Sequence, residues 1–184
     1  RFMEIAVPLG APRAAALQTL MTAENLSILE FELADEAATR ALGGALAGRL
    51  RPGDLILLEG DLGAGKTALA RALVQAHLAA HGLAEDVPSP TFTLVQTYES
   101  PALLIAHVDL YRIEDASELR ELGLAETIDE GVVIVEWPER AAREIRRLSR
   151  DCLDISLALM PEGIRRARLE GRGSWAARLE GLTI

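Results

Sequence analysis

Apolar residues follow two different spacings along this chain, and each spacing predicts a different type of element. The runs 54–59 (DLILLE) and 132–136 (VVIVE) are almost wholly apolar, which is typical of strands that are buried on both faces of a sheet. Residues 34–50 and 67–81 carry apolar side chains every three or four positions, which predicts amphipathic helices. Strands and helices therefore alternate through the middle of the chain, as they do in α/β proteins.

The remaining predicted elements complete a layered domain. Residues 27–32 alternate apolar and polar positions, which predicts a strand at the edge of the sheet. Further predicted strands are 93–98, 103–110, 152–160 and 164–170, and further predicted helices are 114–122 and 139–148. The last two strands flank Pro161-Glu162-Gly163, which is typical of a hairpin turn. We expect a three-layer α/β domain with a mostly parallel central sheet that ends in an antiparallel hairpin.

Residues 1–25 differ in pattern from the rest of the chain. They are rich in alanine and leucine, and Pro8 and Pro12 interrupt any apolar run that could serve as a secretory signal. The whole chain has 184 residues, enough for one domain with a substantial core. We therefore expect a poorly defined extension over 1–25 and a single domain over 26–184.

Composition excludes several classes of protein. No apolar run approaches the roughly 18 residues that cross a bilayer, so we expect no membrane association. A single cysteine, Cys152, excludes an intrachain disulfide and fits a reducing compartment, which favours the cytoplasm. A net charge of −9 argues against a surface devoted to nucleic acid.

The use of lysine points to a functional site. Arginine supplies 18 of the 19 basic residues, and Lys66 is the only lysine. It lies in residues 60–67, GDLGAGKT, which satisfy the P-loop pattern G-x-x-x-x-G-K-[ST] between a predicted buried strand and a predicted helix. In this motif, glycines let backbone amides approach phosphate oxygens, the lysine reaches the β- and γ-phosphates, and the hydroxyl of Thr67 binds Mg²⁺. The motif thus predicts a site for a nucleoside triphosphate with Mg²⁺.

The residues expected to bind the nucleotide here are those of the loop and the helix start: Asp61, Leu62, Gly63, Ala64, Gly65, Lys66 and Thr67. The overlapping pattern G-x-G-x-x-A resembles a dinucleotide fingerprint, but no acidic residue ends a second strand about 20 residues on. Guanine recognition of the Ras type needs a second lysine, which the chain lacks. ATP is therefore favoured.

Two acids and one hydroxyl are candidates for the chemistry. Asp109 and Glu136 each end a predicted apolar strand, where side chains of an open α/β sheet point into the ligand crevice. Either acid can hold Mg²⁺ or position water. Thr91 lies in the segment 89–93, SPTFT, which is either a loop that senses the γ-phosphate or an ordinary turn.

Other patterns are less specific. The i, i+4 spacing of His77 and His81 resembles half of a zinc site, but the motif's general-base glutamate and a third ligand are missing, so we interpret them as exposed residues of a helix face. Residues 85–136 carry 12 acids and 2 arginines, whereas 138–178 carry 10 arginines and 6 acids. The arginines over 140–150 form either a solvated helix face, a phosphate-sensing element, or a docking surface for an acidic partner or RNA.

Five segments in this order and spacing resemble the TsaE (YjeE) family of small bacterial ATPases over roughly residues 30–160. They are GDLGAGKT (60–67), SPTFTL (89–94), HVDLYR (107–112), ELGL (121–124) and VIVEWPE (133–139). The resemblance implies a role in forming threonylcarbamoyladenosine at position 37 of tRNA. It also implies partnership with the TsaD–TsaB transferase, whose repeated turnover the ATP cycle supports, and contact with tRNA only through that complex.

The resemblance also implies roles for single residues. Lys66 and Thr67 would serve the phosphates and Mg²⁺, Glu136 would be the carboxylate on Mg²⁺, and Asp109 would be a second acid needed for hydrolysis. Thr91 would be the switch-loop hydroxyl and Trp137 would lie close to the nucleotide. Phe92 stands where tyrosine is common in the family, so a role that depends on tyrosine does not transfer.

The leading hypothesis is a Mg²⁺-dependent ATPase of this type. Hydrolysis is expected to be slow without partners, because no arginine finger or glutamine is evident. One alternative is a small-metabolite kinase in which the segment Arg140–Arg150 closes as a lid over phosphate. Another is a binding module whose docking depends on bound ATP alone.

Overall fold

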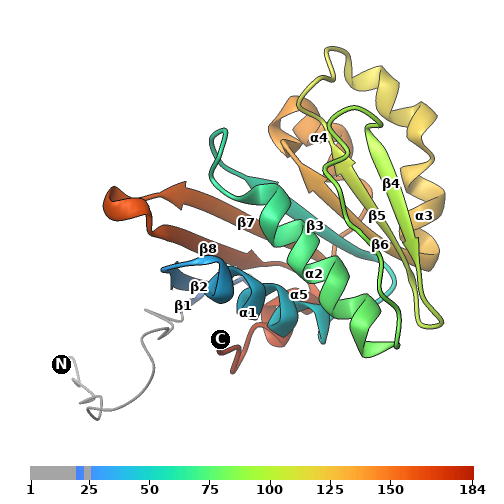
Figure 1. Cartoon of the computed structure of the whole chain (residues 1–184). Coiled ribbons are helices and arrows are strands. Elements are labelled where there is room, and N and C mark those ends of the chain that lie inside the picture. The colour runs from blue at the N-terminus through green and yellow to red at the C-terminus, as the bar shows by residue number, and fades with distance from the viewer. Residues whose placement is uncertain (1–19, 23–25) are drawn as a thin grey trace, which may run out of the picture.

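The structure, a computed structural model, describes residues 20–22 and 26–184 and contains one eight-stranded mixed sheet (Figure 1). The order across the sheet is β1-β2-β8-β7-β3-β6-β5-β4. The strands are β1 (Leu20–Thr22), β2 (Leu26–Leu33), β3 (Asp54–Glu59), β4 (Val95–Glu99), β5 (Leu104–Asp109), β6 (Gly131–Glu136), β7 (Cys152–Leu159) and β8 (Arg165–Gly171).

Parallel pairing is confined to the centre of the sheet. Strands β7, β3, β6 and β5 pair in parallel, whereas β1, β2 and β8 on one side and β4 on the other pair antiparallel. The α/β class and the C-terminal hairpin of β7 and β8 are thereby confirmed. The antiparallel part is larger than expected, because apolar spacing identifies strands but does not reveal their pairing partners.

The sheet begins inside the stretch that we assigned to the extension. Residues 20–22 form β1 and pair with the start of β2. The strand that we predicted at the edge of the sheet therefore lies at the edge only in the part of β2 that follows this pairing. The rest of the proposed extension, residues 1–19 and 23–25, lies outside the described residues.

Two long helices agree with the predicted periodicity. Helix α1 (Glu36–Ala47) begins where the carboxylate of Asp35 accepts a hydrogen bond from the backbone N–H of Ala38 at 2.8 Å. Helix α2 (Lys66–Ala80) begins directly at the end of the glycine-rich loop, and its first residue is the lysine. The two helices lie side by side across one face of the sheet (Figure 1).

The shorter helices differ from the predictions. The predicted helix 139–148 is wrong: the segment forms a 3₁₀ turn, η2 (Pro138–Ala141), and one helical turn, α4 (Ala142–Ile145). The backbone of Ala141 has φ −148° and ψ 42°, which breaks the helix between the two. The predicted helix 114–122 is a 3₁₀ helix, η1 (Ala116–Leu122). Three short helical elements were not predicted, namely α3 (Leu124–Glu130), η3 (Pro161–Gly163) and α5 (Ser174–Arg178).

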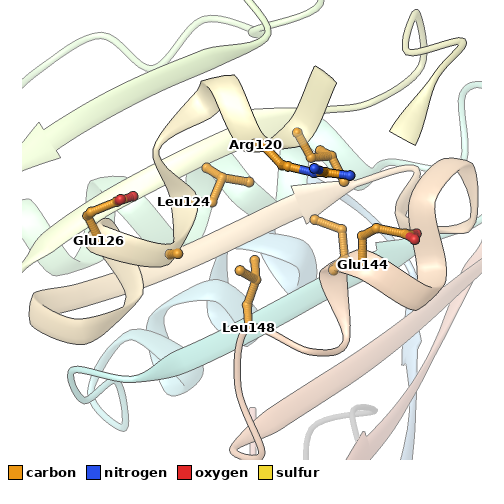
Figure 2. Close-up of a pocket in the computed structure, with 8 residues that line it drawn as sticks. Arg120, Leu124, Glu126, Glu144 and Leu148 are labelled. Carbon is orange, nitrogen blue, oxygen red and sulfur yellow. The ribbon is translucent and has the colours of Figure 1, made fainter. Parts of the chain in front are cut away.

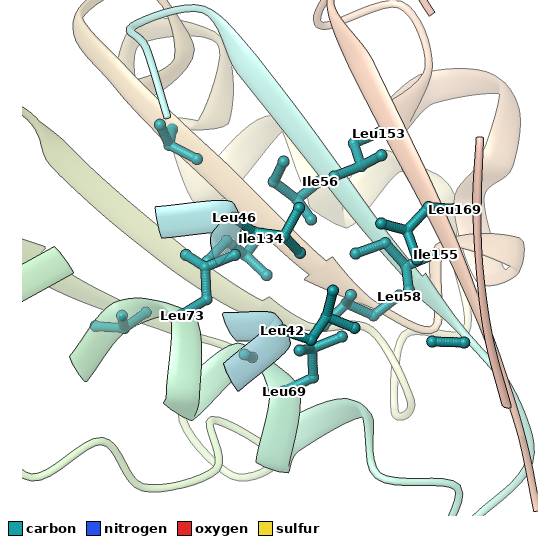
Figure 3. Packing of buried hydrophobic residues seen from close by; sticks show 14 of the residues in the cluster. Leu42, Leu46, Ile56, Leu58, Leu69, Leu73, Ile134, Leu153, Ile155 and Leu169 are labelled. Carbon is teal, nitrogen blue, oxygen red and sulfur yellow. The ribbon is translucent and has the colours of Figure 1, made fainter. Parts of the chain in front are cut away.

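The core has one layer on each face of the sheet. On the first face, leucines of α1 and α2 pack against side chains of β3, β6, β7 and β8 (Figure 3). Trp175 of α5 is fully buried in the same layer. On the second face, η1, α3 and α4 cover β5, β6 and β3. The sheet is therefore fixed from both sides at its centre, where the loop before α2 begins.

Candidate functional site

Strand register brings the predicted acids to the same edge of the sheet as the loop. Leu58 of β3 lies opposite Glu136 of β6, and Glu136 lies opposite Asp109 of β5. Because these strands are parallel, their carboxyl ends meet at one edge, and the loop before α2 leaves β3 at the same edge. Both acids are buried, with 3% of Asp109 and 2% of Glu136 exposed.

The loop requires glycine at two positions for two different reasons. Gly60 has φ 141°, and a Cβ there would lie 2.3 Å from the carbonyl oxygen of Leu157 in β7, so no larger residue fits. Gly65 has φ 107° and ends the loop in the left-handed region. The loop thus lies directly against the hairpin strand and turns sharply into α2.

The ammonium of Lys66 is turned back onto the loop. Its Nζ donates hydrogen bonds to the carbonyl oxygens of Gly60 at 2.5 Å and Asp61 at 2.9 Å, and it lies 3.6 Å from the ring centroid of Trp137. Only 5% of the residue is exposed. Burial lowers the pKa of the Lys66 ammonium, while neighbouring acids, Glu136 first among them, oppose that shift. The positive charge of Lys66 is therefore partly buried, and an anionic ligand bound beside it would stabilise the charged form.

Two hydrogen-bonded pairs join the loop elements to the acids. The hydroxyl of Thr67 donates to Glu136 Oε2 at 2.8 Å, and the hydroxyl of Thr91 donates to Asp109 Oδ2 at 2.6 Å. The Ser89 hydroxyl lies 2.7 Å from that of Thr91, and the backbone N–H of Tyr111 donates to Asp109 Oδ1 at 2.9 Å. Each acid is thus oriented by a threonine on the P-loop or on the 89–93 segment.

A cavity of about 280 Å³ opens between these groups. Its lining residues are Leu62, Gly63, Gly65, Lys66, Thr67, Ala68, Thr91, Tyr111, Glu136 and Trp137. Of the residues proposed from the sequence, three lie outside this lining. Asp61 is exposed, Ala64 is buried with its N–H donating to the Asp61 carbonyl, and Asp109 contacts the cavity residue Thr91.

Two residues that sequence reasoning missed stand near the cavity. Tyr111, two residues after Asp109, places its ring 4.9 Å from that of Trp137. Arg165 begins β8, and a Cβ on Gly65 would lie 3.0 Å from its Nε. That Nε is buried without a hydrogen-bond partner, and Arg165 forms no ion pair within the described residues. A sequence signal existed for Tyr111, in HVDLYR, but none for Arg165.

The placement of Arg165 follows from the alternation along β8. Ala167 and Leu169 face α1 and α2, so Arg165 has the same orientation at the loop end of the strand. Arg166 and Arg168 point to the other face, where they lie opposite Glu32 and Glu30 of β2 and pair with them. Arg165 is therefore the arginine of this strand that is directed at the glycine-rich loop.

The donor set fits Mg²⁺ bound together with phosphate. Within the described ranges, no group of three or more His, Cys, Asp or Glu side chains is arranged to hold a metal ion by itself. The hydroxyl of Thr67 and the carboxylate of Glu136 supply two oxygens beside a lysine and free helix N–H groups. Mg²⁺ is commonly held in this way, by one or two protein oxygens, water and substrate phosphates.

Of His77 and His81, which we interpreted as exposed residues of a helix face, His77 does not match that interpretation. His77 is buried, with 5% exposed, and its Nε2 lies 2.8 Å from the Ser100 hydroxyl, so it is not an exposed helix-face residue. His81 is exposed, and its Nδ1 lies 2.9 Å from the His77 carbonyl oxygen. Burial, and then the neighbouring His81, lower the pKa of His77. The pair connects α2 to the β4–β5 turn.

The arginine-rich segment does not have the form of a lid. Ala141 and Ile145 are buried in the core, and Arg146 forms ion pairs with Asp154 at 2.5 Å and Glu59 at 3.5 Å. Helix α4 also forms one wall of a second, apolar groove of about 220 Å³. In Figure 2, Leu124 and Leu148 point into this groove, with Glu126 at one end and Arg120 and Glu144 at the other. The segment is a packed part of the domain.

This combination of sheet, loop and acids defines the class of protein. The fold is that of P-loop NTPase-like α/β proteins, with the phosphate loop between a central strand and α2. The sequence profile of the family described as "Threonylcarbamoyl adenosine biosynthesis protein TsaE" matches residues 33–167, well over half of the chain. The chain belongs to the TsaE family.

Individual relatives agree with this assignment. A protein of Rickettsia felis named "tRNA threonylcarbamoyladenosine biosynthesis protein TsaE" is 41% identical over 107 residues, which cover 58% of this chain and 61% of that protein. A protein of the same name from Nostoc sp. is 40% identical over 128 residues, 65% of this chain and 76% of that protein. The match thus spans less than two thirds of the Rickettsia felis protein.

The fold has also been seen in a solved structure. The crystal structure of Bacillus subtilis YdiB superposes with a TM-score of 0.69 at 27% identity, covering 85% of this chain and 95% of that one. In the part of the chain that the structure describes, no helix is both long and apolar enough to cross a membrane.

Proposed function

We propose that this chain is a Mg²⁺-dependent ATPase that takes part in forming threonylcarbamoyladenosine at position 37 of tRNA. The proposal depends on one observation above all: Lys66, Thr67 and Glu136 meet at a P-loop in a member of the TsaE family. The names of the curated relatives support the tRNA role. The geometry of the loop and acids supports the nucleotide chemistry.

Binding of ATP would use contacts that the loop now makes with itself. Lys66 would release the carbonyl oxygens of Gly60 and Asp61 and turn to the β- and γ-phosphates, since an ammonium is better paired with phosphate than with neutral carbonyls. Thr67 and Glu136 would hold Mg²⁺. The guanidinium of Arg165 would approach the nucleotide from the β8 side of the loop, opposite the acids.

Hydrolysis would depend on Asp109 and Thr91. Water attacks the terminal phosphorus, the bond to the bridging oxygen breaks, and ADP and phosphate are released. Asp109 is oriented by two hydrogen bonds and stands behind Thr91 at the cavity, so it can orient or deprotonate the attacking water. Arg165, the cation that sequence reasoning missed, lies beside the loop on the side away from the acids. Slow turnover without partners therefore remains our expectation.

The partners that we propose are the TsaD and TsaB proteins of the threonylcarbamoyl transferase complex, with tRNA engaged only through them. Three exposed apolar side chains gather around the nucleotide cavity or on adjoining loops: Leu62 (80% exposed), Phe92 (82%) and Tyr111 (40%). Such residues are typical of surfaces that become covered in a complex. A complex formed at this rim would be sensitive to bound nucleotide. We also propose a cytoplasmic location.

Nucleotide binding can be tested directly with the tryptophan at the site. Mg²⁺-ATP should draw Lys66 away from the ring of Trp137 and change its fluorescence, while the buried Trp175 should remain unaffected. A Trp137→Phe variant is the matched control and should bind ATP without the signal. No binding of ATP by calorimetry would reject the proposal.

The cellular role requires reconstitution. The transferase pair and unmodified tRNA should support repeated rounds of modification only when this chain and ATP are added. A Glu136→Gln variant should bind nucleotide but not sustain the repeated rounds. Equal multiple turnover without this chain would reject its part in the reaction. Transfer of phosphate to a small metabolite instead of water would favour a kinase.

A further inference from the structure

His107 lies in the interior of the sheet beside the proposed metal ligand. It is opposite Ile134 in the β5–β6 register, so Glu136 is two residues further along on the same face. Its Nε2 is 2.8 Å from Glu136 Oε1, and the two side chains are 0% and 2% exposed. His107 does not line the nucleotide cavity, so it can act only through Glu136.

The hydrogen bond has a defined direction. A carboxylate oxygen only accepts, so the imidazole must carry a proton on Nε2. The other ring nitrogen, Nδ1, is buried and has no hydrogen-bond partner among residues 20–22 and 26–184. A proton on Nδ1 would therefore lie in the interior without an acceptor. The geometry therefore identifies Nε2 of His107 as the donor and Glu136 Oε1 as the acceptor of this hydrogen bond.

The carboxylate of Glu136 is consequently held at both oxygens. His107 holds Oε1, and Thr67 holds Oε2 at 2.8 Å. The Thr67 hydroxyl and Oε2 are also the two atoms proposed to bind Mg²⁺. When they turn to the cation, the hydrogen bond from His107 is the contact of this carboxylate that remains.

We infer that His107 is a positioning residue that presents Oε2 of Glu136 to Mg²⁺ at Thr67. This inference rests on the proposed function. Hydrogen-bond donors behind metal-binding carboxylates fix the orientation of the ligand, and their removal typically weakens metal binding by about 10- to 100-fold. A solely structural histidine would affect folding but would not set the requirement for Mg²⁺.

The test is a Mg²⁺ titration of nucleotide binding by two variants. His107→Phe fills the space without a donor, whereas His107→Gln keeps an N–H at a similar reach. With a fluorescent ADP analogue, His107→Phe should bind as tightly as the wild-type chain in EDTA but should need roughly tenfold more Mg²⁺ or higher for half-saturation. His107→Gln should return the half-saturating concentration to within about threefold of wild type. His77→Gln, at a buried histidine bonded to Ser100, is the matched control and should leave it unchanged.

The outcomes separate this inference from the proposed function. Unchanged Mg²⁺ dependence in His107→Phe would overturn the inference while leaving ATP binding in place. The inference would also be overturned if both variants bound the ADP analogue equally weakly in EDTA and both lost thermal stability, because that result would show a structural role for His107. If the wild-type chain bound no ADP analogue at all, the proposed function would fail as well. If His107→Phe does not fold, His107→Leu replaces it as the variant without a donor, with the same expected result and the same refuting result.

Discussion

Replacing Lys66 with methionine should separate folding from nucleotide binding. Methionine has a similar length and no charge. In the folded chain the ammonium gains hydrogen bonds to Gly60 and Asp61 but is 95% removed from solvent, and its pKa is lowered by that burial. These contributions oppose each other, so the free energy of unfolding without ligand should change by no more than about 1 kcal/mol in either direction.

The same substitution should have a large effect once nucleotide is present. Lys66 would supply charged hydrogen bonds to two phosphates, each worth about 1.5–3 kcal/mol. A loss of about 3 kcal/mol corresponds to roughly 100-fold weaker binding. Ligand should consequently stabilise the wild-type chain far more than the variant, because that stabilisation follows the ratio of ligand concentration to Kd.

Urea unfolding with and without Mg²⁺ and a non-hydrolysable ATP analogue, together with calorimetric titration of the same ligand, measures both quantities. Arg71→Met is the matched control, since it also removes a positive charge from α2 but at a residue bonded to the Val87 carbonyl. Binding by Lys66→Met within threefold of wild type would refute the assignment of the phosphate site. A loss of more than about 3 kcal/mol of stability without ligand would instead refute our account of the buried ammonium.

Three further predictions concern groups outside the nucleotide cavity. Arg178→Met should lower the free energy of unfolding, measured in urea, by about 3–5 kcal/mol. The substitution leaves the carboxylate of Asp54, which is 1% exposed and 2.5 Å from Arg178, buried without its ion-pair partner. A loss below about 1 kcal/mol would contradict this. Burial raises the pKa of the Cys152 thiol from 9.0 to about 12, so iodoacetamide at pH 8 should label it only in unfolded chains. The thiol of the unfolded chain ionises at lower pH than that of the folded chain, so the free energy of unfolding should fall between about pH 9 and pH 12. The Cys152→Ala variant should lack this contribution. Labelling of the folded chain as fast as the unfolded chain would refute the burial of the thiol. The pKa of His77 is lowered from its ordinary 6.5, so the unfolded chain takes up the proton first and stability should fall as pH drops below 6.5. His77→Gln should lose less stability than wild type between pH 8 and pH 5, and an equal loss would count against the burial of this imidazole.

The phosphate loop and its acids could be predicted because their signals are local. The pattern from Gly60 to Thr67 lies within eight residues, and Asp109 and Glu136 each end a strand that is recognisable from its own apolar run. Parallel pairing then brings these ends together without further information.

What the sequence did not reveal depends on contacts between distant segments. Arg165 reaches the loop only because β8 pairs with β7 and β7 pairs with β3. No local sequence pattern distinguishes it from the other 17 arginines. The break of the 139–148 helix at Ala141 is set by tertiary packing, since alanine itself favours a helix. The burial of His77 likewise depends on Ser100 in a turn that is remote along the chain.

The close approach of Gly60 to Leu157 has a consequence for the order in which the protein is made. The glycine-rich segment leaves the ribosome long before β7 and β8. In the folded chain, however, it lies against the carbonyl group of Leu157 in β7 and the guanidinium of Arg165 in β8. Nearly a hundred residues must be synthesised before these supports exist. A nascent chain that ends before these strands would hold the entire glycine–lysine signature and still lack the surface that shapes it, so nucleotide binding should arise only after residue 165 has been synthesised.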